Sequence, residues 1–469
     1  MHLLKTHKIL FCISNFVLFP LVSMKVAYAT PSAHSLVVEM PVSSKIDGSS
    51  IGSLASLNKS SELSKTQIAY PRIPHDQFNV RQYGAQGDDK TVNTISFQWA
   101  LDSCSKAGGG TVEVPIGRYV TGPLVIHSNT NLHIRNGATL LFINTINTYP
   151  MKGGSYQNCI SAENAHDIAI TGNGTIDGQG SPWWAKYRKP DGSDISPDLP
   201  RRPNLIVFSN CKRVLIQKVT LINSPSFHLV PERCTDVIID GIKIKSPSNS
   251  PNTDGIDPSG HNFLITNCTF DVGDDCIAIK PSGKGDSKDP SCSNFLISHC
   301  TFLHGHGMSI GGQTPGGLQN LIVEDCKFDG TEAGIRMKAS QGEGGLVENL
   351  KYQNITMDNV NVPILITSYY PHIPPNPQSI ALSPITATTP KWENITISNL
   401  KAVNCGLAIL IVGLPQMKIK DIRFDNVQIS SSRGANITNA ENITFTNSAI
   451  VPQSGPALVT HNATVAGLR

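Results

Sequence analysis

Three aspartates and one histidine lie in short, turn-like strings of this sequence: Asp254, Asp274, Asp275 and His306. Grouped carboxyl groups can hydrolyse a glycosidic bond, because one protonates the leaving oxygen while another activates water or attacks carbon. Crowded carboxylates also repel one another, and this raises the pKa of one of them and keeps it protonated as an acid. Taken singly, an aspartate beside a glycine is more often a turn former. Their relative placement therefore has to decide between the two interpretations.

Two cations follow these residues along the chain. Arg336 and Lys338 are separated by a single methionine in the string that begins at Gly334. Because side chains alternate between the two faces of a strand, both cations project from the same face. Arg and Lys bind carboxylates, Arg with two parallel hydrogen bonds and Lys as a point charge. The pair indicates an anionic sugar as substrate or, in the simpler alternative, a solvated strand face.

An internal repeat positions these residues. Ten segments share two short alternating runs, which are broken by one or two polar residues, and nearly all begin with Asn or Asp. A unit of this kind cannot bury its apolar face alone, but stacked units can, and their variable spacing allows loops of different lengths. The pattern predicts an all-β, single-domain parallel β-helix in which the first Asn or Asp of each unit forms a tight turn and stacks on its neighbours. The units begin at 167, 213, 236, 262, 294, 320, 349, 394, 421 and 442.

The register of the repeats places the polar residues together. Asp274 lies twelve residues after the start of the 262 unit, and His306 lies twelve residues after the start of the 294 unit. We therefore expect them at the same position on adjacent coils, about 4.8 Å apart. Asp254 belongs to the preceding coil, and Arg336 belongs to the coil after His306. This coincidence over four successive coils favours a catalytic site over a series of unrelated turns.

The N-terminal segment and the first ordered element have their own signals. Residues 1–29 resemble a signal peptide, with Lys5 and Lys8 before an apolar run and the string Ala27-Tyr-Ala29 at its end. Residues 30–74 are rich in Ser and Ala and suggest a linker or arm, and residues 75–469 are expected to form the β-helix domain. A short helix over roughly 93–106, capped by Asp88 or Asp89, is expected to cover the open end of the core.

The composition limits the classes of partner. Hydrophobic residues make up 39% of the 469 residues and charged residues 16%, while 39 Gly and 31 Pro favour a turn-rich β protein. The net charge of +3 falls to zero without residues 1–29, which hold three Lys and no acid. No global basic field recruits a partner, so nucleic acid is not expected. After residue 29 no stretch is long and apolar enough to cross a membrane. A monomer is expected.

Cysteines leave two alternatives open. Ten of the eleven follow the signal-like segment, which permits disulfides in an oxidising compartment. Cys268, Cys300 and Cys326 occupy equivalent repeat positions, so they can equally stack as small buried apolar groups. Among possible disulfides, Cys276 with Cys292 or Cys300 is the first to examine.

Four motifs together resemble the signature of glycoside hydrolase family 28, the polygalacturonases. The opening string from Phe78, the string Asp177-Gly-Gln-Gly180 and Trp183-Trp184 resemble the same family, so the resemblance covers roughly residues 76–450. It implies a right-handed parallel β-helix and a secreted, extracellular enzyme that hydrolyses α-1,4-galacturonosidic bonds of pectin with inversion and without a metal or other cofactor. The four motifs are Asn252-Thr-Asp254, Gly273-Asp274-Asp275, Gly305-His306-Gly307 and Arg336-Met-Lys338.

The resemblance also implies roles for single residues. Asp274 corresponds to the general acid, Asp254 and Asp275 to the residues that hold and activate water, and His306 to a group that tunes the acid. In an inverting enzyme the acid and the water-activating carboxyl groups are expected about 6.5–9.5 Å apart. The substrate-binding residues implied in the same way are Asn252, Arg336, Lys338 and Tyr370, with Tyr369 as a competing choice for the last.

The sequence departs from the family pattern at two positions. Met337 stands where the family usually has Ile, which conserves volume. Gly312 ends the string after His306 where the family usually has Ser, and this change is expected to alter loop packing.

Other functions remain in competition. Endo action on pectin or polygalacturonate is favoured, and exo action depends on whether residues 185–203 or 281–292 block the groove. A rhamnogalacturonan hydrolase of the same family is disfavoured by His306, which that branch lacks. A pectate lyase of similar fold needs a Ca²⁺ site and an Arg or Lys base, and no lyase motif occurs. A non-catalytic carbohydrate-binding β-helix does not require the carboxylates.

Overall fold

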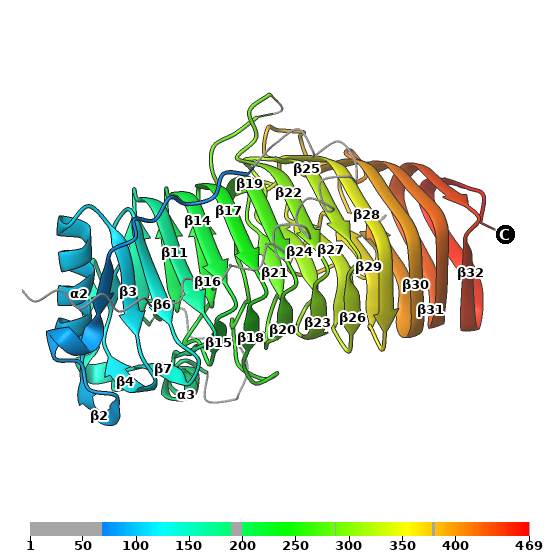
Figure 1. Ribbon diagram of the computed structural model, residues 1–469. Helices are drawn as coiled ribbons and strands as arrows, with labels where there is room; N and C mark the ends of the chain where they lie inside the picture. The colour runs from blue at the N-terminus through cyan, green and yellow to red at the C-terminus, as the bar shows by residue number, and fades with distance from the viewer. Residues whose placement is uncertain (1–67, 189–198, 287, 378–379, 469) are drawn as a thin grey trace, which may run out of the picture. The chain divides into compact units, whose positions relative to one another are not determined.

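Short parallel strands separated by turns make up most of the computed structural model, which describes residues 68–188, 199–286, 288–377 and 380–468. These residues belong to one compact unit. The strands wind into successive coils, and each strand pairs with its counterpart in the next coil (Figure 1). The expected signal peptide and residues 30–67 of the expected arm lie outside the described residues. Residues 68–76 carry no helix or strand, and the first strand begins at Gln77.

Three ladders of parallel strands form the walls of a right-handed β-helix, as predicted from the repeat. The first ladder, called ladder one, contains the predicted unit starts. The long strands near the C-terminus run through the corners between walls, so they take part in more than one ladder. Ladder one consists of β1 (Gln77–Asn79), β3 (Gly110–Val114), β6 (Thr130–Ile134), β11 (His166–Gly172), β14 (Lys212–Gln217), β17 (Cys234–Asp240), β19 (Gly260–Thr266), β22 (Cys292–Ser298), β25 (Leu318–Glu324) and parts of β28 (Leu346–Asp358), β30 (Lys391–Val412), β31 (Ile419–Thr446) and β32 (Ala449–Ala466).

Ladder two follows ladder one within each coil and has mostly strands of three to five residues. Its strands also pair in parallel from coil to coil. Ladder two consists of β2 (Asp88–Val92), β4 (Gly117–Thr121), β7 (Ala138–Phe142), β12 (Thr175–Asp177), β15 (Thr220–Ile222), β18 (Lys243–Lys245), β20 (Thr269–Asp271), β23 (Thr301–His304), β26 (Lys327–Asp329) and parts of β28, β30, β31 and β32 (Ala449–Ala466).

Ladder three is interrupted in its middle. At this point the chain forms no strand, and Ile256 alone pairs with the strand before it and the strand after it. The polar motifs of the sequence border this ladder. Its strands are β5 (Leu124–Val125), β10 (Ile160–Glu163), β13 (Ile206–Ser209), β16 (Leu229–Glu232), β21 (Ile277–Ile279), β24 (Met308–Gly312), β27 (Ala333–Ala339), β29 (Val362–Thr367) and parts of β30, β31 and β32.

Left-handed turn residues mark the start of every predicted repeat unit. All ten predicted starts, from 167 to 442, have φ between 54° and 61°, a region in which Asn and Asp are strongly enriched. Three of these asparagines donate from Nδ2 to the residue one coil earlier: Asn262 to Asp236 at 3.0 Å, Asn294 to Asn262 at 3.1 Å and Asn320 to Asn294 at 3.1 Å. The predicted stacking of turn residues is therefore confirmed.

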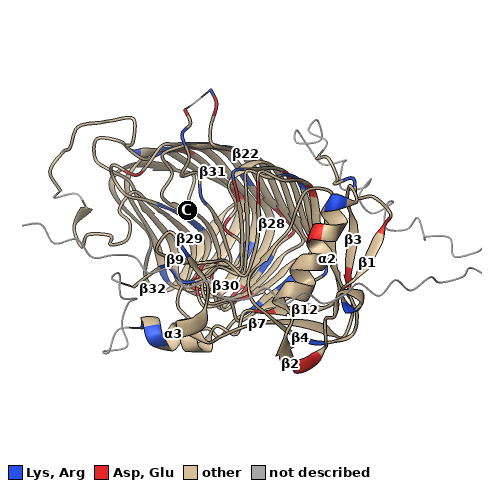
Figure 2. Cartoon of the chain, turned by 90° about the vertical axis from the view of Figure 1, so that its left-hand side faces the viewer, with Lys and Arg blue, Asp and Glu red and all other residues tan. Residues whose placement is uncertain are grey.

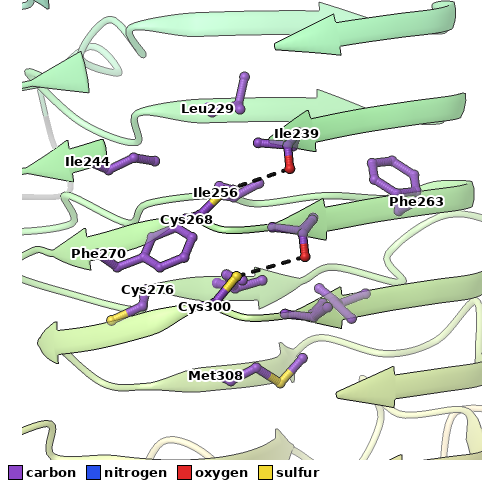
Figure 3. Close-up of a cluster of buried hydrophobic side chains, with 14 of the residues drawn as sticks. Leu229, Ile239, Ile244, Ile256, Phe263, Cys268, Phe270, Cys276, Cys300 and Met308 are labelled. Carbon is purple, nitrogen blue, oxygen red and sulfur yellow. Dashed lines mark hydrogen bonds between the residues drawn. The ribbon is translucent and has the colours of Figure 1, made fainter. Parts of the chain in front are cut away.

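Aligned side chains also fill the core. Phe270, Phe302 and Phe328 stack with ring centroids 5.2 and 4.3 Å apart. The Sγ atoms of Cys268 and Cys300 donate to main-chain carbonyl groups one coil earlier (Figure 3). All ten cysteines after residue 29 are buried free thiols.

The candidate disulfide of Cys276 with Cys292 or Cys300, one of the two alternatives left open, is not formed in this structure. Cys276 is fully buried, and its Sγ donates to the carbonyl oxygen of His304 at 2.9 Å instead. The alternative of stacked, buried thiols describes Cys268, Cys300 and Cys326.

An amphipathic helix covers the N-terminal end of the coils, as predicted. Helix α2 (Thr94–Lys106) buries Phe97, Ala100, Leu101 and Cys104 against the first strands. Figure 2 shows the β-helix from this end, viewed along its axis, with α2 toward the viewer. The predicted cap is wrong: Asp88 lies in β2, where Oδ1 accepts from the main chain of Lys90 and Thr91, and the helix begins after Asn93.

The other short elements lie in connections between consecutive strands of a coil. No helix among the described residues is long and apolar enough to cross a membrane. These elements are the 3₁₀ helices η2 (Val80–Tyr83) and η3 (Ile146–Thr148), strands β8 (Met151–Lys152) and β9 (Ser155–Tyr156), and helix α3 (Ser181–Tyr187).

Candidate active site

Asp274 and His306 lie side by side on adjacent coils, as the repeat register predicts. Thr269 pairs with Thr301 in ladder two, and a bulge follows before the chain enters ladder three. The main-chain N–H of His306 then donates to the carbonyl oxygen of Asp274 at 2.9 Å. The bulge leaves the two motifs adjacent while it turns their side chains out of the regular strand pairing.

Asp275 is enclosed by cations from the following coils. Its Oδ1 accepts from Ser309 Oγ at 2.8 Å and from Arg336 at 3.1 Å, and its Oδ2 accepts from Lys338 Nζ at 2.7 Å. The side chains of Asp275 and Lys338 are only 2% and 4% exposed. Burial by itself raises the pKa of Asp275, but the charges of Lys338, Lys280 and Arg336 hold it well below its usual value. Asp275 is therefore ionised.

Asp274 shares a proton with a histidine. His306 Nδ1 lies 3.1 Å from Asp274 Oδ1, and Asn252 Nδ2 donates to Asp274 Oδ2 at 3.2 Å. On its other side, His306 Nε2 lies 3.0 Å from a carboxylate oxygen of Glu332. Burial lowers the pKa of His306, but the two carboxylates have the larger effect and raise it to about 9.

Repulsion between carboxylates does not raise the pKa of Asp274, the expected acid, above its usual value. Burial opposes ionisation of Asp274, yet its hydrogen bond with His306 lowers its pKa below the usual value. The pKa is raised instead at Asp254, by burial and then by the charges of Asp257 and Asp274. The pKa of Asp257 is raised as well, mainly by burial. The proton available to Asp274 is thus the one it shares with His306.

Lys280 and Asp257 belong to the cluster although the motifs did not include them. Lys280 Nζ lies 3.8 Å from Asp254 and 3.7 Å from Asp257, and both carboxylates are almost completely buried. Their charges raise the pKa of Lys280 even though burial opposes this. A signal for Lys280 exists: it ends the apolar run after Asp275, in the same alternation that led to Arg336 and Lys338.

Arg336 and Lys338 share a face of β27, as predicted, but both point at Asp275. Ser309 pairs with Arg336 and Gly311 pairs with Lys338 in the strand register. Two positive charges therefore face one carboxylate, which leaves one positive charge in excess for an anionic ligand.

Tyr370 borders a hollow of about 690 Å³ beside these cations, called the Tyr370 hollow. Its ring centroid lies 5.0 Å from Lys338 Nζ, and the tyrosine is more exposed than Tyr369. A Cβ atom on Gly312 would lie 2.5 Å from this ring, so glycine at 312 allows the tyrosine to approach. The hollow is lined by Arg201, Phe227, Val230, Glu232, Asp257, Ser259, Lys280, Ser282, Gly312, Gln313, Ser340, Glu343, Tyr370 and Pro371.

A second hollow of about 630 Å³ shares Arg201 and Phe227 with the first and is called the Arg202 hollow. Asn252, which contacts Asp274, lies in its wall. Both segments expected to shape a groove contribute: Ser282 to the Tyr370 hollow, and Tyr187 to the Arg202 hollow. The second hollow is lined by Ser155, Tyr156, Asn158, Tyr187, Leu199, Pro200, Arg201, Arg202, Asn204, Ser226, Phe227 and Asn252.

Among the residues that the structure describes, one group of side chains is close enough together to bind a metal ion. Single atoms of Asp274, Asp275 and His306 lie within 4.8 Å of one another. However, Asp275 already accepts from Arg336 and Lys338, whose positive charges oppose a second cation beside it. The same distance shows that facing oxygens of Asp274 and Asp275 are closer than the separation that we expected between an acid and a water-activating carboxyl group.

The coiled fold and the carboxylate–cation cluster define a glycoside hydrolase, and the comparisons with known proteins give its family. Residues 104–450 match the model of glycosyl hydrolases family 28, so the chain belongs to this family. It is 30% identical over 406 residues to a probable polygalacturonase of Vitis vinifera, with 80% of each chain covered.

Two further relatives are named for different activities. An endo-polygalacturonase of Pectobacterium parmentieri is 29% identical over 374 residues, which cover 75% of this chain and 87% of that protein. The crystal structure of an exopolygalacturonase from Thermotoga maritima superimposes with a TM-score of 0.70 at 28% identity, covering 82% of this chain and 94% of that chain. The structural match supports the predicted β-helix.

Proposed function

We propose that this glycoside hydrolase is a secreted polygalacturonase that cleaves α-1,4-galacturonosidic bonds within pectin or polygalacturonate. The contact between Asp274 and His306, beside an ionised Asp275 held by two cations, carries the proposal. The activities named for the relatives support polygalacturonase activity and include both endo and exo action. Secretion rests on the signal-like residues 1–29.

Asp274 is proposed as the general acid. The proton shared between His306 Nδ1 and Asp274 Oδ1 passes through Asp274 to the leaving glycosidic oxygen. Glu332 keeps the imidazole protonated, and Asn252 fixes the second oxygen of Asp274. His306 is thus a proton source that acts through Asp274, and Glu332 and Asn252 are positioning residues.

Asp254 and Asp275 are proposed to hold and activate the attacking water in a single displacement with inversion. Asp275 is ionised and orients the water by its charge. Asp254 has a raised pKa, so its anion is the stronger base. The neighbouring Lys280 stabilises that anion.

Arg336 and Lys338 are proposed to bind the carboxylate of a galacturonate residue with the charge that Asp275 leaves uncompensated. Tyr370 supplies a partly exposed ring next to Lys338, on which a sugar face can pack. Because the two hollows share Arg201 and Phe227, a polymer can continue past both of them, and this favours endo action.

Digestion of polygalacturonate in the presence of EDTA tests the proposal. Sizing of the early products should give a mixture of oligomers without unsaturated ends. Release of monomer alone indicates exo action. Unsaturated ends together with dependence on calcium identify a lyase and contradict the proposal. Cleavage of rhamnogalacturonan without cleavage of polygalacturonate contradicts it as well.

A further inference from the structure

His228 is a buried histidine that none of the four sequence motifs contains. Its relative exposure is 0%, and both of its ring nitrogens have partners. Nδ1 lies 3.0 Å from the main-chain carbonyl oxygen of Asp254. Nε2 lies 3.0 Å from Ser246 Oγ and 3.4 Å from the main-chain nitrogen of Ser224. The imidazole therefore joins a candidate water-activating residue to two buried serines.

The partners of the ring fix its protonation state. A carbonyl oxygen only accepts, so Nδ1 carries the proton and donates it to Asp254. A main-chain N–H only donates, so Nε2 accepts from Ser224 and, in the same way, from the hydroxyl group of Ser246. Burial opposes the charged ring and lowers the pKa of His228 to about 4. The imidazole is therefore neutral, with one donor and one acceptor, and both are used.

Two hydrogen bonds from this one residue hold the main chain at Asp254. Its carbonyl oxygen accepts from the main-chain N–H of His228 at 2.8 Å as well as from Nδ1. The N–H of the next residue, Gly255, donates to the carbonyl oxygen of Asp275 at 2.9 Å. In this stretch ladder three has no strand and pairs only at Ile256. The imidazole thus adds a fixed contact where regular strand pairing is interrupted.

The carboxylate of Asp254 depends on its main chain more than the neighbouring acids do. Its Oδ1 is buried and has no hydrogen-bond partner among the described residues, and its Oδ2 lies 3.8 Å from Lys280 Nζ. Asp274 and Asp275, by contrast, each accept hydrogen bonds from side chains. Since no side-chain hydrogen bond fixes the Asp254 carboxylate, its direction follows from the position of its own main chain.

We propose that His228 is a positioning residue that directs the Asp254 carboxylate toward the attacking water. The inference rests on the proposed function, in which Asp254 and Asp275 activate that water. His228 is completely buried and acts only through the main chain of Asp254. Because a catalytic group has to be held close to its productive geometry, a shift of Asp254 should slow the chemical step and leave substrate binding almost unchanged.

His228→Asn and His228→Gln each keep one half of the imidazole. The amide nitrogen of asparagine takes the place of Nδ1 and still donates to Asp254, whereas the amide oxygen of glutamine takes the place of Nε2 and still accepts from Ser246. Both variants change the packing of the core, so both should lower the melting temperature. Ser298→Ala is the control, because Ser298 Oγ donates to Thr266 Oγ1 at 3.0 Å in a buried pair of ladder one.

His228→Gln should lower kcat on polygalacturonate about 10-fold or more, since a displacement of about 1 Å costs up to about 100-fold in rate. His228→Asn should keep kcat within about 3-fold of the parent, and KM should change less than about 2-fold in both variants. Ser298→Ala should lower the melting temperature and leave kcat and KM unchanged. Equal kcat values for the two His228 variants, or a rise in KM at constant kcat, would overturn the proposal.

A measurement on the parent protein tests the same point without a substitution. Nitrogen NMR of isotopically labelled histidine should show His228 as a neutral ring protonated at Nδ1, with no titration between about pH 5 and 8. A ring protonated at Nε2 would overturn the proposal even if neither variant folds. Failure of the proposed function shows differently, as parent protein that does not cleave polygalacturonate at all.

Discussion

The turn ladder and the candidate active site use the same coil-to-coil stacking in opposite ways. In ladder one, Asn262, Asn294 and Asn320 repeat the same residue at the same position, and each donates to the one before. In ladder three, successive coils place Ala278, Ser309 and Arg336 in register. The first arrangement is uniform, whereas the second changes chemistry at every step.

The difference follows from what can be stacked at the spacing of adjacent strands. An amide offers both a donor and an acceptor, so identical asparagines satisfy one another indefinitely. Identical charges at about 4.8 Å repel, so an ionic cluster needs charges of both signs. Asp274 accordingly faces His306, and Asp275 faces Arg336 and Lys338. The candidate catalytic groups thereby border ladder three, and the turn ladder carries none of them.

The largest expected effect of breaking the ionic arrangement is on the acid. Asp274→Asn should lower kcat by roughly 10²–10⁴-fold, the contribution of general acid–base catalysis, because the amide cannot deliver the proton shared with His306. The melting temperature should stay within a few degrees of the parent. Reducing-end assays and thermal unfolding measure both effects, and near-normal turnover would remove Asp274 from this role.

Loss of a buried cation should reduce stability next. Lys338→Met leaves Asp275 buried with less compensation and should lower the free energy of unfolding by about 3 kcal/mol. Lys420→Met is the control, since the pair with Glu393 is partly exposed and should contribute less than about 1 kcal/mol. Denaturant unfolding of both variants compares them. Equal losses would mean that the cations of ladder three are no different from surface charges.

A smaller effect is expected in the turn ladder. Asn294 has φ of 61° and takes part in two ladder hydrogen bonds. Asn294→Ala should lower the free energy of unfolding by about 2 kcal/mol, through lost bonds and a left-handed backbone. Asn294→Gly, which retains the backbone freedom, should cost about half as much. Both should leave kcat unchanged, and a large loss of kcat would contradict the separation of the two ladders.

The smallest expected effect is a shift in pH dependence. Glu332 helps to raise the pKa of His306 to about 9, so Glu332→Gln should bring that pKa back toward its usual value. The imidazole then loses its proton at lower pH, and the alkaline limb of the kcat profile should move to lower pH. NMR titration of His306 and the pH profile of kcat measure the change. An unmoved histidine pKa would mean that Glu332 does not act on the site.

The repeat made most of the fold predictable. Hydrophobic alternation and a polar residue at each unit start were enough to place all ten left-handed turns and the neighbouring coils. The equivalence of Asp274 and His306 followed from counting twelve residues in two units. What these predictions share is that each depends on a constant offset within the repeat, which is visible in the sequence.

Two of the residues that were missed differ in how visible they were in the sequence. Arg202 comes from a loop between ladders two and three of its coil, where no repeat offset applies. Glu332 lies twelve residues after Asn320, at the same offset as Asp274 and His306 in their units, so the same count could have found it. The pKa pattern was also missed, because it depends on burial and on Lys280 as well as on the neighbouring carboxylates. Counting residues within the repeat shows which residues lie on adjacent coils. It does not show how deeply a side chain is buried or in which direction it points.

The configuration of the newly formed end tests the central claim most directly. The claim is that the Asp274–His306 pair protonates the leaving oxygen while water held by Asp254 and Asp275 attacks from the opposite face. Proton NMR during the first minutes of trigalacturonate hydrolysis should show the β-anomer before mutarotation, since the substrate bond is α and one displacement inverts it. An α-anomer as the first product, or a trapped covalent glycosyl-enzyme, would contradict the account.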